Sequence, residues 1–332
     1  MFVSVLLLLL GFVMLVKGAD WFVDGASGIA AKLKIPELVI GLTVVAFGTS
    51  LPELAVSVSS AIKGSAELTI GNVVGSNIMN ILLILGLSAV FSPLPVNKNL
   101  KKTDFPVLLV VTCLFILFGA VDNRMDRMEG GILFIALIAY TIFLIWNGLR
   151  QNKGSNIAPM PEITAQNAQE EPKQTWYESM KQKGWFLLII TLVGLVLIVW
   201  GADVAVNAAT DIATELGVSE RIIGLTVVAI GTSLPELVTS VMAAIKGKSD
   251  IAVGNVVGSN IFNITMVAGL SSLIMPLPFA SAFVIDSGIA LGAAALLSVL
   301  GYLPSGKIER WGGVLMLLGF VGYFTYLFLL PV

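Results

Sequence analysis

Two glutamates stand alone in long apolar stretches of this chain. Glu53 and Glu236 lie within two matched segments, 41–81 and 224–264, which are identical at 29 of 41 positions at an offset of 183 residues. An ionised side chain inside a membrane is costly, and such residues commonly mark ion pathways or proton relays. Their presence at matched positions of a duplicated segment predicts that the chain handles ions.

Each glutamate ends a Gly-Thr-Ser-Leu-Pro-Glu run. Pro52 has no N–H and its ring crowds the carbonyl of Gly48, so we expect the helix to loosen or break there. Carbonyls freed in this way are tolerated in a membrane only where they face protein or a hydrated cavity. Thr49 and Glu53 are four residues apart and share a helix face. The second copy repeats the run as Gly231, Thr232, Ser233, Leu234, Pro235 and Glu236.

A second polar motif, Gly-Asn-Val-Val-Gly-Ser-Asn, follows in each copy. It places a polar residue at every fourth position, which forms one stripe along a helix. The stripes are Asn72, Ser76 and Asn80 in the first copy, and Asn255, Ser259 and Asn263 in the second. Carboxylate, amide, hydroxyl and carbonyl oxygens suit Ca²⁺, and Na⁺ is a hard cation of the same preference. For the individual residues Asn72, Asn77, Asn255 and Asn260, helix packing remains an equal alternative to ion binding.

The composition indicates a membrane protein. Apolar residues make up 57% of the 332 residues and charged residues only 12%. The apolar runs recur along the whole chain and are long enough to cross a hydrocarbon core of about 30 Å as helices. The chain has no His and a single Cys, Cys113, which argues against zinc, copper or iron as substrates. The ten spans that we predict are 2–24, 37–62, 68–92, 103–121, 129–149, 184–207, 220–245, 250–274, 281–303 and 309–330.

The basic residues predict the orientation of these spans. Alternate loops carry 14 of the 19 Lys and Arg residues, whereas the opposite loops carry four. Since cytoplasmic loops are enriched in Lys and Arg, we expect both termini outside and the loop after the fifth span in the cytoplasm. The location predicted is therefore a plasma or inner membrane, with the chain crossing it many times.

An odd number of spans in each copy predicts inverted repeats. We expect five helices in residues 1–149 and five in 184–332, joined by a flexible, polar cytoplasmic linker at 150–183. Five spans bring the second copy into the membrane from the opposite side, so the halves are related by a pseudo-two-fold axis in the membrane plane. The match extends to Asp20 and Asp203, for which a structural or gating role is favoured over ion ligation.

At these residues the sequence resembles the cation/calcium exchanger superfamily, and within it the prokaryotic sodium/calcium exchangers. The resemblance rests on the paired GTSLPE and GNVVGSN motifs and covers essentially the whole chain. It implies an all-α fold in which spans two, three, seven and eight form an ion-binding bundle. It also implies that spans one and six slide against this bundle to give alternating access.

The resemblance further implies which residues bind ions. Glu53 and Glu236 would be the carboxylates shared by Ca²⁺ and Na⁺, and Asn80 and Asn263 would lie at the middle of the site. The residues implied around them are Thr49, Ser50, Thr232, Ser233, Ser76 and Ser259, with the carbonyls of Ala46 and Ala229. Many sodium/calcium exchangers carry Asp at one or both central positions, whereas this chain has Asn at both. Two carboxylates give a charge of −2, which argues against the family's usual exchange of three Na⁺ for one Ca²⁺.

We therefore expect a secondary antiporter that exchanges Na⁺ for Ca²⁺, and not an enzyme. A Ca²⁺/H⁺ antiporter, or a K⁺-dependent variant, on the same fold is the alternative, and a cation channel is a further one. An ATP-driven pump is disfavoured because the chain has no phosphate-binding Gly-Lys-Ser/Thr loop. The expected partners are Ca²⁺, Na⁺ and the lipid bilayer, with no cofactor, no nucleic acid and a monomeric state.

Overall fold

The computed structural model describes residues 1–64, 66–154, 180, 183–216 and 229–329. Most of the predicted linker, and the start of the predicted span 220–245, lie outside the described residues. The long helices are α1 (Phe2–Leu33), α4 (Leu51–Ile62), α5 (Ala66–Met79), α7 (Phe105–Val121), α8 (Arg127–Gly154), α10 (Gly184–Glu215), α13 (Leu234–Ile245), α14 (Ser249–Phe262), α16 (Ser281–Tyr302) and α17 (Arg310–Leu329).

Short helical segments extend several of these helices. The α-helical ones are α2 (Glu37–Ile40), α3 (Ala46–Thr49), α6 (Gly86–Phe91), α12 (Ala229–Thr232) and α15 (Gly269–Ile274). The π-helical ones, in which hydrogen bonds span five residues, are η1 (Gly41–Val45), η2 (Asn80–Leu85), η3 (Leu100–Asp104) and η5 (Asn263–Ala268). Single π-helical turns within α-helices are uncommon and often lie at functional sites.

The described residues contain seven helices that are long and apolar enough to cross a membrane, or eight when a bent pair counts as one span. The bent pair is Glu37–Thr49 with Leu51–Ile62, which matches the predicted span 37–62. Helices α12 and α13 lie in the described part of the predicted span 220–245, and α17 corresponds to the tenth span. Helix α1 continues to Leu33, beyond the predicted end at residue 24, because Gly25, Ala26 and Ala30 are buried and extend its packed face.

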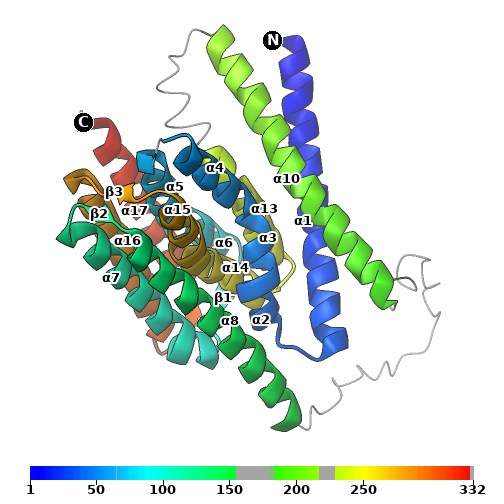
Figure 1. The fold of residues 1–332 in the computed structure, drawn as a ribbon. Helices are drawn as coiled ribbons and strands as arrows, with labels where there is room; N and C mark the ends of the chain where they lie inside the picture. The colour runs from blue at the N-terminus through cyan, green and yellow to red at the C-terminus, as the bar shows by residue number, and fades with distance from the viewer. Residues whose placement is uncertain (65, 155–179, 181–182, 217–228, 330–332) are drawn as a thin grey trace, which may run out of the picture.

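Helices α1 and α10 form an antiparallel pair along one side of the molecule (Figure 1). Their glycines bring the two backbones into contact: a Cβ atom on Gly18 would lie 2.8 Å from the carbonyl oxygen of Gly194, and one on Gly194 would lie 2.7 Å from that of Gly18. Gly201 meets the carbonyl of Gly11 in the same way. Small residues permit such close packing of helices in a membrane, where apolar contact with lipid competes with contact between helices.

The remaining helices surround a central core. In the span Ser249–Ile274 every residue of the most apolar window is buried, whereas in Phe2–Leu33 only 22% of that window is buried. Helix α14 lies against α13, η1 and α3, and α5 lies against α4 and α16. The α4–α5 and α13–α14 pairs therefore form the interior of the protein, and α1 and α10 lie at its edge.

Two short antiparallel sheets tie the repeats together outside the helices. Strand β1 (Leu94–Pro95) pairs with β4 (Lys307–Ile308), and β2 (Arg124–Met125) pairs with β3 (Leu277–Pro278). Leu94 and Leu277 are 183 residues apart, as are Met125 and Ile308, so each strand of one repeat pairs with the other repeat in the same register. The offset seen in the motifs therefore holds through the peripheral helices as well.

Candidate functional site

The broken helix places each glutamate at the start of a half-helix. Helix α3 ends at Thr49, Ser50 leaves the helical conformation, and α4 begins at Leu51 with Pro52 in its first turn, at an angle of 46° to the preceding segment. Glu53 lies in that first turn, where the helix dipole favours a carboxylate. The C-terminal end of α3, where the last carbonyls of a helix lack the N–H partners of a following turn, faces the same break. The predicted break is thus present, and Ser233 and Pro235 repeat it before Glu236.

Both glutamates are buried in the interior, Glu53 at 1% exposure and Glu236 at 0%. The Oε2 atom of each has no hydrogen-bond partner among the described residues, and neither carboxylate forms an ion pair with a described Lys or Arg. Each carboxylate contacts the broken helix of the other repeat, so the two glutamates share one interior. Since a buried carboxylate needs a compensating charge, this pair has the chemistry of a cation site.

Serine hydroxyls connect the carboxylates across the two repeats. Ser50 Oγ donates to Glu236 Oε1 at 3.0 Å, and Ser233 Oγ donates to Glu53 Oε1 at 3.3 Å. Ser233 Oγ also lies 3.3 Å from Ser76 Oγ. Each serine therefore orients the glutamate of the opposite repeat and leaves that carboxylate's second oxygen free to bind an ion.

Asn80 and Asn263 occupy equivalent places at the first residue of π-helical segments η2 and η5. Both are fully buried. The Oδ1 atom of each has no hydrogen-bond partner among the described residues, whereas each Nδ2 donates to an asparagine of the other repeat. Two amide oxygens thus remain unpaired in the same interior as the two carboxylates.

The other residues expected at the site lie on the same broken helices and their partners. Thr49 Oγ1 lies 3.1 Å from both the Val45 carbonyl and Asn255 Oδ1, so its hydroxyl is already engaged. The Ala46 carbonyl accepts the N–H of Ser50 at 3.1 Å. Thr232 is half-buried at the end of α12, whose first residue is Ala229. Ser259 is buried on α14, near Glu236.

Asn72 and Asn255 join helices within each repeat. Asn72 Nδ2 donates to Ser57 Oγ at 2.9 Å, and Asn255 Nδ2 donates to Ser240 Oγ at 2.9 Å. These contacts hold α5 against α4, and α14 against α13. The amide nitrogens of these two residues therefore serve packing. The serines that accept from them, Ser57 and Ser240, lie outside the two polar motifs but are identical in the two copies.

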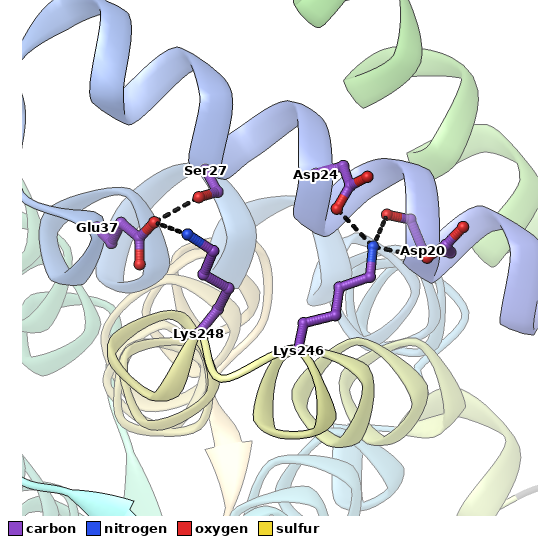
Figure 2. Close-up of polar contacts among 6 residues, drawn as sticks. All are labelled: Asp20, Asp24, Ser27, Glu37, Lys246 and Lys248. Atoms are coloured by element: carbon purple, nitrogen blue, oxygen red, sulfur yellow. Dashed lines mark hydrogen bonds and ion pairs between the residues drawn. The ribbon is translucent and has the colours of Figure 1, made fainter. Parts of the chain in front are cut away.

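Three acidic residues outside this interior, Asp20, Asp24 and Glu37, are paired with lysines (Figure 2). Lys246 Nζ lies 2.6 Å from Asp20 Oδ1 and 2.5 Å from Asp24 Oδ1. Lys248 Nζ lies 2.8 Å from Glu37 Oε1. Asp20 therefore pairs with Lys246 and not with the glutamates, which fits a structural role. Its counterpart Asp203 is exposed on α10.

The interior set offers oxygen ligands and few charges. The described residues contain no group of three or more His, Cys, Asp or Glu side chains placed to hold a metal ion. Two carboxylates with amide and hydroxyl oxygens can instead hold hard cations such as Ca²⁺ or Na⁺, which accept neutral oxygen ligands. The fold and this interior define a polytopic α-helical membrane protein built from two equivalent halves.

A family model described as sodium/calcium exchanger protein matches the chain twice, at residues 3–146 and 186–329. The chain belongs to this family of cation/calcium exchangers, so it is a membrane transporter and not an enzyme. The predicted fold class and the family resemblance are both confirmed.

Similar proteins cover nearly the full length. The putative antiporter CaxA of Alkalimonas amylolytica is 37% identical over 99% of both chains. The sodium/calcium exchanger MaX1 of Methanosarcina acetivorans is 36% identical over 98% of this chain and 99% of its own. A solved structure of the sodium-calcium exchanger NCX_Mj, soaked with Na⁺ and Ca²⁺, matches with a TM-score of 0.81 and 33% identity, covering 97% of this chain and 98% of the other.

Proposed function

We propose that this protein is a secondary antiporter that exchanges Na⁺ for Ca²⁺ across the membrane by alternating access. The observation that carries the proposal is the buried pair Glu53 and Glu236, each with a free Oε2 atom and without a described Lys or Arg as its counter-charge. A bound cation supplies that charge, and Ca²⁺ and Na⁺ would compete for the same oxygens. Competition for one site couples the two fluxes as an exchange.

The ligand set proposed is the one expected from the sequence, with Asn80 and Asn263 contributing Oδ1 atoms beside the two carboxylates. Its other members are Thr49, Ser50, Thr232, Ser233, Ser76, Ser259 and the carbonyls of Ala46 and Ala229. Because both carboxylates are buried, ions reach them only when helices move. The exposed, antiparallel pair α1 and α10 is the element proposed to move against the interior helices.

The membrane arrangement belongs to the same proposal. Both termini would lie outside and the linker 150–183 in the cytoplasm, with the five-helix repeats at 1–149 and 184–332. The distribution of Lys and Arg supports this orientation. The transporter would act as a monomer in the plasma or inner membrane.

The proposal is tested by uptake of ⁴⁵Ca²⁺ into sodium-loaded proteoliposomes. Glu53→Gln and Glu236→Gln each remove one of the two buried charges, so each should abolish uptake. Glu67→Gln is the matched control, because Glu67 is exposed in the first turn of α5. Wild-type uptake that survives in either site variant would contradict the proposal.

A further inference from the structure

Four asparagines form two crossed hydrogen-bond relays between the repeats. Asn263 Nδ2 donates to Asn77 Oδ1 at 3.1 Å, and Asn77 Nδ2 donates to the backbone carbonyl of Asn260 at 3.3 Å. In the second relay, Asn80 Nδ2 donates to Asn260 Oδ1 at 3.0 Å, and Asn260 Nδ2 donates to the backbone carbonyl of Asn77 at 3.3 Å. All four side chains are buried, at 4% exposure or less.

The direction of each relay is fixed at its backbone end. A backbone carbonyl accepts hydrogen bonds and cannot donate one, so Asn77 must turn its NH₂ group toward it. The Oδ1 atom of Asn77 then faces Asn263, which must donate a hydrogen bond to it from its own NH₂ group. The Oδ1 atom of Asn263 is left facing the opposite way, without a described partner. The same reasoning orients Asn80 through Asn260.

We infer that Asn77 and Asn260 are positioning residues that turn the Oδ1 atoms of Asn263 and Asn80 into the ion site. This inference rests on the proposed cation exchange and deepens it. The relays convert two amides, which could present either end, into two fixed oxygen ligands beside Glu53 and Glu236. Ligands that are already fixed bind ions more tightly, because they lose less conformational entropy on binding.

The relays also explain why positions 80 and 263 both carry Asn and not Asp. An ionised Asp at position 263 would set an oxygen against Asn77 Oδ1, with no proton between them. Asn77 could not reverse its amide in response, because its own oxygen would then oppose the carbonyl of Asn260. The relays therefore keep the ionised carboxylates of the site at two, and its charge at −2.

A double-mutant cycle tests this inference, with Ca²⁺ affinity of the purified protein measured by titration calorimetry. Asn263→Ala should weaken binding about tenfold, and Asn77→Ala by a similar factor. If Asn77 acts through Asn263, the Asn77→Ala/Asn263→Ala pair should bind no more weakly than Asn263→Ala alone. The control pair Asn77→Ala/Asn80→Ala spans both relays, so its effects should multiply.

Two outcomes distinguish failure of this inference from failure of the proposed function. Multiplied effects for the 77/263 pair would overturn the inference, because they would show that Asn77 acts independently of Asn263. Wild-type protein that binds no Ca²⁺ would instead overturn the proposed function. If an Asn77 variant does not fold, the second relay supplies the same test with Asn260→Ala and Asn80→Ala.

A second observation concerns the ion pairs of Lys246 in Figure 2, for which the described residues of the other repeat show no equivalent. Lys246, in the turn between α13 and α14, contacts two aspartates of α1 and donates to the Asp20 carbonyl at 2.8 Å. Its counterpart by the 183-residue offset is Lys63, which is exposed and forms no ion pair with a described residue. The counterpart of Asp24 is Asn207, which carries no charge.

We propose that Lys246 latches α1 to the interior helices and biases the transporter toward the conformation described here. Inverted repeats exchange conformations during transport, so contacts present in both repeats favour neither state. A contact present on one side alone stabilises the state in which it forms. Lys246 is only 20% exposed, which strengthens its pairing relative to that of a fully solvated lysine.

The latch is tested by comparing the apparent KM for Ca²⁺ at the two faces of the membrane, in right-side-out and inside-out vesicles. Lys246→Met removes the charge and keeps most of the stem, so the ratio of the two KM values should change about fivefold. Lys246→Arg should preserve the ratio, and Lys63→Met should leave it unaltered. A ratio that Lys246→Met does not change, or that Lys63→Met changes equally, would overturn the latch.

Discussion

Ser50 donates a hydrogen bond to Glu236 from the opposite repeat, 186 positions away in the sequence, at 3.0 Å. Ser233 donates to Glu53 in return. Each half of the molecule thus orients the carboxylate of the other half. The candidate site is therefore complete only when both repeats are in place, which is a physical reason for the chain to carry both copies of the motif.

Ser50→Ala and Ser233→Ala should each raise the apparent KM for Ca²⁺. Each substitution removes a hydrogen bond to a charged group, worth about 1.5–3 kcal/mol, and frees the carboxylate to turn. The pseudo-two-fold relation predicts effects of similar size for the two variants. Ser88→Ala is the control in uptake assays, because Ser88 is equally buried but bonds to the Ile84 carbonyl of its own helix. A KM unchanged by Ser50→Ala would contradict the orienting role.

Gly194→Ala should destabilise the protein in detergent. Its new Cβ atom would lie 2.6 Å from the Phe22 backbone nitrogen and 2.7 Å from the Gly18 oxygen, so α1 and α10 must separate. Overpacking of this kind costs about 1–3 kcal/mol. Gly288→Ala is the control, because an added Cβ there meets no described atom within 4 Å. Thermal unfolding measures both, and equal melting temperatures would show that the glycine contact is dispensable.

The exchange should be electroneutral, with two Na⁺ for each Ca²⁺. Two ionised carboxylates balance one Ca²⁺ or two Na⁺, whereas a third Na⁺ would leave a net positive charge in a buried site. Initial uptake rates in proteoliposomes should therefore be independent of a membrane potential set by valinomycin and K⁺. Uptake rates that rise with an inside-positive potential, which favours net positive charge leaving with Na⁺, would indicate a third ion.

The sequence predicts much of this architecture because the signals are local. Apolar runs give most span ends to within a few residues, except those of α1 and α10, which run on to Leu33 and Glu215, and Pro52 gives the break at Ser50. Helix α1 extends beyond its predicted end at residue 24, where Gly25 and Gly28 pack against Thr191 and Leu187 of α10, a contact between the repeats that no local pattern shows. Local motifs also place Glu53 and Glu236 on equivalent helices.

Contacts between the repeats could not be predicted in this way. These contacts depend on the angle and position at which the helices cross, because several side chains on each helix face could meet there. The sequence does not select Ser50 with Glu236, or Asn263 with Asn77, from these combinations. The π-helical segments that begin at Asn80 and Asn263 are likewise set by tertiary packing. The 183-residue offset is the one sequence feature that relates these contacts. Given one contact, such as Ser50 with Glu236, it predicts the reciprocal contact, Ser233 with Glu53.

Sodium-driven calcium transport is the central claim, and purified protein in proteoliposomes tests it most directly. ⁴⁵Ca²⁺ uptake is measured with an outward Na⁺ gradient and an outward H⁺ gradient applied separately, at a clamped potential. The account predicts uptake with the Na⁺ gradient alone, and none in Glu53→Gln. Uptake that follows only the H⁺ gradient would contradict it and assign the protein to calcium/proton exchange.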